Sequence, residues 1–93
     1  MRKIEQTEQF RADYRRAAVA RYRPALGALL SSVLSWLGSD APLPVKYRDR
    51  AMIGEWSDHQ SCHLQRDWIL IYRKPDEHTL QLVRLGSQDE LGL

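Results

Sequence analysis

Three residues in the second half of the chain have side chains suited to cleaving a phosphodiester: His63, Asp67 and Arg84. A histidine can transfer a proton near neutral pH, and a carboxylate can tune that histidine or transfer a second proton. An arginine can stabilise the charge of a pentavalent phosphate. Trp68 follows the aspartate and offers a face on which a nucleobase could stack. The set therefore indicates chemistry on a nucleic-acid backbone.

Each of these residues also has a structural interpretation. His63 could be a packed or merely exposed strand residue, and Asp67 could cap the turn before its strand by accepting backbone N–H bonds. Trp68 could belong to the core. Arg84 would be structural if it paired with Asp or Glu, whereas in a groove without a partner it would hold a phosphate by two hydrogen bonds. The residue types alone leave both interpretations open.

The basic residues are unevenly distributed. The net charge is only +2, yet arginines crowd the first quarter of the chain, and Lys46, Arg48 and Arg50 form a second cluster. Such a cluster is either a solvated face or a surface that binds phosphates or an acidic partner protein.

The bulk properties define a small globular protein. A chain of 93 residues predicts one domain, residues 1–93. The single cysteine, Cys62, excludes an internal disulfide, and no Cys/His spacing predicts a zinc site. No apolar run is long enough for a membrane span, and the first residues lack the apolar stretch of a signal peptide. We therefore expect a cytoplasmic protein without a metal or other cofactor.

The hydrophobic periodicity predicts an α+β domain. We expect a short strand over residues 2–6, a helix over 8–21 capped by Thr7, and a second helix over 24–37 that pairs with the first as an antiparallel hairpin. Residues 38–48, with two prolines, predict a loop. Strand-like segments follow at 60–65, 67–74 and 79–85, with a turn at Gln65-Arg66. They predict a three-stranded antiparallel sheet with the helices on one face.

Strand alternation then assigns faces to the candidate residues. Ser61, His63 and Gln65 should share one face of their strand, and Leu80, Leu82 and Arg84 one face of the last strand. If the first of these faces is open, His63 points outward among polar groups.

The order of motifs from Leu43 to Leu91 resembles the YafQ branch of the RelE/ParE superfamily, the toxins of type II toxin–antitoxin pairs. The matching segments are Leu43-Pro44-x-x-Tyr47-x-Asp49, Gly54-x-Trp56, Cys62-His63-x-x-x-Asp67-Trp68-Ile69-Leu70-Ile71-Tyr72 and Leu82-x-Arg84-x-Gly86-Ser87-x-x-x-Leu91. They cover about half of the chain in the family's order.

The resemblance implies a microbial-RNase-like fold and cleavage of mRNA on the ribosome, restrained by a cognate antitoxin protein. It also implies roles by position: His63 as a catalytic histidine, Asp67 as the catalytic carboxylate, and Arg84 as the arginine that stabilises transition-state charge. Trp68 matches the tryptophan after the aspartate. With the resemblance, the cluster Lys46, Arg48 and Arg50, together with Trp68, is interpreted as RNA-binding.

The chain departs from the family pattern at three positions. The family usually has His where this chain has Arg50, His where it has Gln88 after Gly86-Ser87, and Phe where Gly92 follows Leu91. An amide at Gln88 can position a substrate but cannot donate a proton as a histidine can. Losing a general acid costs about 10²–10⁴-fold in rate, so we expect a slow endoribonuclease.

Two other functions remain open from the sequence. The chain could be a catalytically degenerate protein that binds the ribosome or an antitoxin, which Gln88 and Gly92 favour. It could also be a ParE-like inhibitor of DNA gyrase, against which the pairing of Cys62-His63 with Asp67-Trp68 speaks.

Overall fold

The first and last strands of the chain lie side by side. β1 (Lys3–Gln6) pairs in parallel with β5 (Thr79–Gly86), and Lys3 lies opposite Thr79. The structure is a computed structural model that describes residues 1–18, 23–65 and 67–93. Its sheet has five strands in the order β1-β5-β4-β3-β2, and all neighbours except β1 and β5 are antiparallel.

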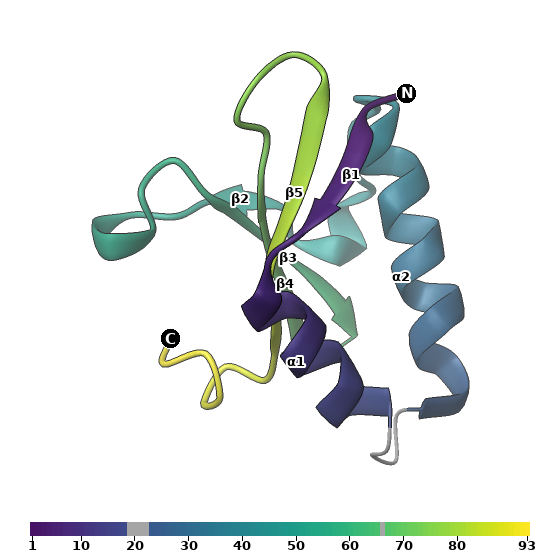
Figure 1. The fold of residues 1–93 in the computed structure, drawn as a ribbon, viewed down its shortest axis with the longest axis vertical. Coiled ribbons are helices and arrows are strands. Elements are labelled where there is room, and N and C mark those ends of the chain that lie inside the picture. The colour runs from purple at the N-terminus through teal and green to yellow at the C-terminus, as the bar shows by residue number, and fades with distance from the viewer. Residues whose placement is uncertain (19–22, 66) are drawn as a thin grey trace.

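The remaining elements lie between these two strands in the sequence. They are helices α1 (Glu8–Ala18) and α2 (Arg23–Gly38), the 3-10 turn η1 (Val45–Tyr47), β2 (Arg50–Ala51), the 3-10 turn η2 (Gly54–Trp56), β3 (Gln60–Gln65) and β4 (Trp68–Arg73). In Figure 1, α1 runs down and α2 runs up beside the sheet. In the described part of the chain, no helix combines the length and apolarity that a membrane crossing requires.

The predicted α+β class, the N-terminal strand, both helices and the three later strands are confirmed. The predicted end of the first helix and the turn at Arg66 fall on residues 19–22 and 66, which lie outside the described residues. The sheet differs from the prediction because it has five strands. β2 is only two residues long and β1 is exposed along its whole length, so neither shows the alternation that marks a half-buried strand.

Thr7 joins the first helix to the last strand. Its side-chain oxygen accepts the backbone N–H of Phe10 at 3.0 Å, which confirms the predicted helix cap. The same hydroxyl donates to the carbonyl of Val83 at 2.8 Å, and the Thr7 N–H donates to the carbonyl of Leu82. The start of α1 is therefore fixed to the middle of β5.

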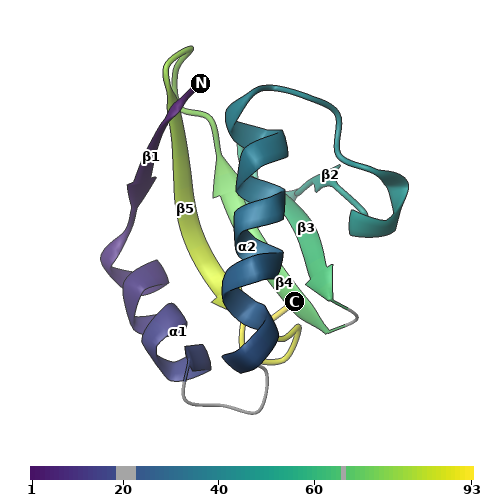
Figure 2. The same cartoon turned by 90° about the vertical axis from the view of Figure 1, so that its right-hand side faces the viewer.

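The main core lies between the sheet and α2, which crosses one face of the sheet in Figure 2. The buried residues of α2 face Trp68, Leu70 and Tyr72 of β4. A smaller cluster on the opposite face contains Ile69, Ile71 and Leu91, and here the C-terminal tail lies against the sheet. Figure 1 shows this tail on the side of the sheet away from α2. Helical residues therefore cover the first face, whereas the described residues over the second face come from the tail and from the segment around η2.

Two β-bulges change the predicted faces. His63 lies opposite Ile69 but Gln65 lies opposite Trp68, so an extra residue, Leu64, turns Gln65 toward α2. The prediction that Gln65 shares a face with Ser61 and His63 is therefore wrong.

The second bulge lies in β5. Leu82 is opposite Tyr72 and Arg84 is opposite Ile71, with Val83 as the extra residue. Because Ile71 and Tyr72 are consecutive, their partners lie on opposite faces. The prediction that Leu80, Leu82 and Arg84 share a face is therefore wrong for Arg84.

Candidate functional site

His63 lies on the sheet face away from the main core, where β3 is paired with β4 on one side but no longer with β2 on the other. It pairs with Ile69, which belongs to the smaller cluster. β2 pairs only with Gln60 and Ser61, so the edge of β3 beyond Ser61 is left to η1 and Arg48. A cavity of about 390 Å³ opens there. Its lining residues are Leu29, Lys46, Tyr47, Arg48, His63, Leu64 and Gln65.

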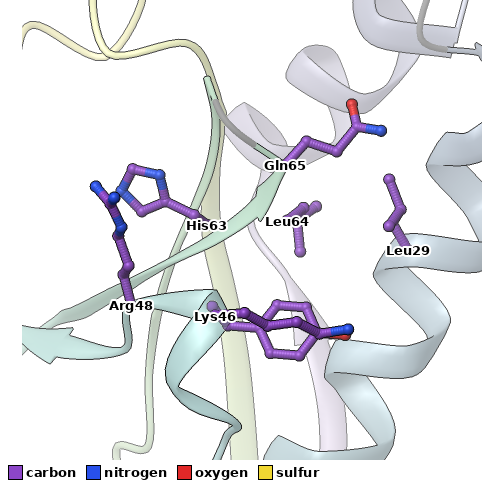
Figure 3. Close-up of a pocket in the computed structure, with 7 residues that line it drawn as sticks. Leu29, Lys46, Arg48, His63, Leu64 and Gln65 are labelled. Atoms are coloured by element: carbon purple, nitrogen blue, oxygen red, sulfur yellow. The ribbon is translucent and has the colours of Figure 1, made fainter.

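This cavity brings an imidazole together with two cations. In Figure 3, His63 and Arg48 point to the same side of β3, whereas Gln65 and Leu64 lie on the side of α2. Neither Lys46 nor Arg48 forms an ion pair with any described residue, and His63 makes no hydrogen bond within the described ranges. The ammonium of Lys46 lies 5.1 Å from the ring centroid of Tyr47. The cavity is therefore suited to binding an anion beside a proton-transfer group.

A second groove, of about 430 Å³, lies beside Ser61, two residues before His63 on β3. Arg50 and Gln88 both line it, with Ser61 and Trp56 among their neighbours. Arg50 is opposite Ser61 in the β2–β3 pair, and Ser61 and His63 share a face of β3. The structure therefore places the candidates His63, Lys46 and Arg48 in one cavity, and Arg50 and Gln88 in the adjacent groove.

Asp67 contacts the C-terminal tail. Its Oδ1 accepts the backbone N–H of Gln88 at 3.3 Å. No hydrogen bond joins His63 to Asp67 among the described residues, so the expected direct contact between them is not seen there. Asp67 is exposed and lies two residues before Ile69, the partner of His63. It is therefore at the same end of the sheet as the histidine, and it fixes the start of the tail.

Arg84 does not join the other basic residues. Its Nε and Nη2 donate to the two carboxylate oxygens of Asp13 at 2.8 and 3.2 Å. Asp13 is fully buried, and its Oδ2 also accepts the N–H of Leu85 at 3.0 Å. Hydrogen bonding and charge from Asp13 raise the pKa of Arg84. The pairing corrects the expectation of a free phosphate-binding arginine: in this structure Arg84 joins α1 to β5.

Trp68 belongs to the core. Its side chain is 5% exposed and packs with Leu70 and Tyr72, as the structural interpretation required. A base could not stack on its ring without a rearrangement of this core. The expected RNA-stacking role of Trp68 is therefore contradicted by its burial.

Two carboxylates near the site, Asp13 and Asp49, have partners that the sequence did not predict. Asp13 is buried on α1 together with Phe10 and Ala17. Asp49 accepts a hydrogen bond from the hydroxyl of Tyr72, which is buried in β4. The sequence did contain one sign of the Asp13 contact. A carboxylate at a buried helix position requires a hydrogen-bonding or cationic partner. No local signal links Asp49 to a tyrosine so distant in sequence.

Metal ligation has no support in the described ranges. No group of three or more His, Cys, Asp or Glu side chains there could hold a metal ion. Cys62 is fully buried, and burial, with a smaller contribution from Asp49, raises the pKa of its thiol to about 12. The thiol is therefore a packing group in the core.

Comparisons with known proteins identify the family of this chain. The family model described as "Bacterial toxin of type II toxin-antitoxin system, YafQ" matches residues 2–92. The mRNA interferase toxin YafQ of Escherichia coli (strain B / BL21-DE3) is 30% identical over 90 residues, which cover 97% of this chain and 95% of that protein.

Solved structures show the same fold. A copper-bound mutant toxin from Helicobacter pylori aligns with a TM-score of 0.88 at 30% identity, over 98% of this chain and 99% of that chain. A chain of the E. coli DinJ-YafQ toxin-antitoxin complex aligns with a TM-score of 0.80 at 30% identity, over 97% and 96% of the two chains.

The fold and these relatives together define a toxin of a type II toxin–antitoxin system. Within that class, the chain belongs to the YafQ family.

Proposed function

We propose that this chain is an endoribonuclease that cleaves mRNA on the ribosome without a metal. The observation that carries the proposal is the cavity in which His63 lies with Lys46 and Arg48. Its two cations are not engaged by acidic side chains of the described residues. Arg48 is therefore available to an RNA phosphate beside the histidine, and Lys46 is available on the α2 side of the same cavity (Figure 3). The name of the E. coli relative, an mRNA interferase, supports the same activity.

The reaction needs one proton removed and one supplied. The 2′-OH of the RNA attacks the adjacent phosphorus, and the bond to the 5′-oxygen breaks, which leaves a 2′,3′-cyclic phosphate and a free 5′-OH. In this scheme His63 accepts the proton of the 2′-OH, and Lys46 and Arg48 stabilise the charge on the phosphate oxygens. Arg50 in the adjacent groove holds the RNA further along the strand.

The site is less well equipped to supply the proton that the leaving 5′-oxygen needs. Asp67 is the candidate acid for the leaving 5′-oxygen, and it already accepts the N–H of Gln88. Gln88 can hold the RNA by hydrogen bonds but cannot supply the proton. We therefore propose slow cleavage, by comparison with relatives that have a histidine at this position.

An antitoxin is the proposed protein partner. The complex of YafQ with DinJ, to which this fold is similar, supports a cognate antitoxin for this chain as well. A ribosomal substrate places the activity in the cytoplasm.

The activity is tested by primer extension on mRNA from translating ribosomes. We expect cleavage by the parent protein and none by His63→Ala, with both proteins equally folded. His78→Ala is the matched control, because His78 is exposed and lines neither cavity. An equally active His63→Ala variant would remove the catalytic assignment.

A degenerate binding protein is the second candidate. Among the described residues, the groove beside Arg50 contains Gln88 and no histidine, so it lacks a group that transfers protons near neutral pH, which favours this candidate. Ribosome co-sedimentation of the parent without any cleaved RNA end, and cleavage by Gln88→His, would establish this alternative.

A further inference from the structure

The hydroxyl of Tyr72 donates a hydrogen bond to Oδ1 of Asp49. Tyr72 is 1% exposed in the core, whereas Asp49 is exposed in the segment between η1 and β2. Burial and then the bond to Asp49 raise the pKa of Tyr72, so its hydroxyl remains a donor at physiological pH. The bond therefore fixes an exposed segment to the centre of the sheet.

The segment fixed in this way carries the basic cluster. Arg48 precedes Asp49 and lines the cavity of His63, and Arg50 follows it and lines the groove of Gln88. Asp49 is the only residue between the two arginines in the sequence. This hydrogen bond therefore holds the backbone segment that carries both arginines.

The backbone beside this bond is strained. Arg48 has φ 49° and ψ 48°, in the left-handed region that non-glycine residues rarely adopt. Its N–H donates to the carbonyl of Val45 at 3.0 Å, which closes the 3-10 turn. Strained backbone of this kind persists where the surroundings determine it, and it is concentrated at functional sites. Here the fixed points are the turn on one side and the bond of Asp49 on the other.

We propose that Asp49 is a positioning residue: held by Tyr72, it directs Arg48 and Arg50 into the two adjacent cavities so that both bind the same RNA strand. This inference rests on the proposed function and adds to it the hydrogen bond that positions the RNA-binding arginines. Asp49 touches neither the RNA nor the reacting atoms, and acts through its neighbours.

Removing one hydroxyl tests this role. Tyr72→Phe keeps the buried ring and deletes the donor to Asp49. We expect the affinity for a short single-stranded RNA to fall about tenfold and the KM of cleavage to rise by the same factor, as for the loss of a hydrogen bond to a charged group. The kcat should change little, because His63 is not displaced. Tyr14→Phe on α1 is the control, since Tyr14 lines neither cavity.

A double-mutant cycle separates positioning from general stability. In an Arg48→Ala/Arg50→Ala background, Tyr72→Phe should have no further effect on RNA affinity. Asp49→Asn should retain most of the affinity because the amide oxygen still accepts the bond, whereas Asp49→Ala should match Tyr72→Phe.

Two results would overturn the inference. One is an unchanged RNA affinity and KM in Tyr72→Phe. The other is an equal loss in the background without the arginines, because the hydroxyl would then act on the whole fold. Either result leaves cleavage by the parent, and hence the proposed function, intact. A parent that neither binds nor cleaves RNA would overturn both.

Discussion

The carboxylate of Asp13 and the guanidinium of Arg84 meet in two hydrogen bonds, of 2.8 and 3.2 Å, at the junction of α1 and β5. The carboxylate is fully buried, and the arginine side chain is 22% exposed. Arg16 also donates to Asp13 at 3.2 Å, and its Nε lies 3.3 Å from Glu90 of the tail. The pair therefore connects the first helix, the last strand and the tail that borders the candidate site.

Replacing Asp13 by alanine should destabilise the protein strongly. The change leaves the guanidinium of Arg84 without its partner in a partly buried position, which costs about 3–5 kcal/mol. Arg16→Ala is the control, because Arg16 is half-exposed and exposed pairs contribute about 0–1 kcal/mol. Urea unfolding would measure the free energy of unfolding of both variants. An equal loss of stability in the two would contradict the conclusion that Arg84 is the main partner of Asp13.

The same pair should make the fold sensitive to acid. Burial by itself would raise the pKa of Asp13, but the bonds from Arg84, Leu85 and Gln9 outweigh burial, so the pKa is lowered. A lowered pKa stabilises the folded state above the unfolded value of about 3.9, and this contribution is lost as the pH falls through the folded pKa.

Thermal melts from neutral pH to about pH 2 would show this loss. Asp13→Asn should melt lower at neutral pH but lose less on acidification. Part of the acid destabilisation should remain in Asp13→Asn, because the pKa values of Asp40 and Asp76 are also lowered. An acid profile parallel to that of the parent would contradict the assignment to Asp13.

Cys62 should react with thiol reagents only when the protein unfolds. Its side chain is 0% exposed, and burial followed by the charge of Asp49 raises the pKa of its thiol to about 12. The reactive thiolate is therefore nearly absent from the folded protein at pH 8. Labelling with a disulfide reagent over a urea series should follow the unfolding curve. Rapid labelling without urea would show that the core beneath β3 opens independently.

The sequence located the strands of the site but not the faces of their residues. The alternation in β3 and β5 predicted where the strands run, because apolar and polar positions differ in burial. A bulge inserts one residue and reverses every later side chain. Leu64 and Val83 are ordinary strand residues, so nothing local marks them as the inserted ones. Gln65 and Arg84 were therefore assigned to the wrong faces.

The partners of the charged residues were unpredictable for a related reason. Asp13 and Arg84 are far apart in sequence and meet only because β1 pairs in parallel with β5, which brings α1 beside the last strand. The exposed strand β1 gave no sign of this neighbour. His63 lies beside Lys46 and Arg48 because the loop before β2 and the strand β3 follow one another closely in the chain.

Arg48 should contribute to RNA binding through charge, and its removal should reduce the salt dependence. Each phosphate contact on single-stranded RNA adds about 0.7 to the slope of log K against log salt. Arg48→Ala should lower the slope by about that amount. Arg11→Ala is the control, because Arg11 is exposed on α1 and lines neither cavity of the candidate site. A slope that falls in Arg11→Ala but not in Arg48→Ala would place the RNA on α1 instead of the sheet.

A histidine at position 88 should accelerate cleavage. Gln88 lines the groove of Arg50, and its backbone is held by Asp67, so a new imidazole would enter the same groove. There it could protonate the leaving 5′-oxygen, a step worth about 10²–10⁴-fold. Single-turnover cleavage of ribosome-bound mRNA by Gln88→His should rise toward that range and fall at alkaline pH as the imidazole loses its proton. Gln88→Ala should show no gain. If Gln88→His also showed none, the limiting step would lie elsewhere, and Asp67 would be the acid that this site already uses.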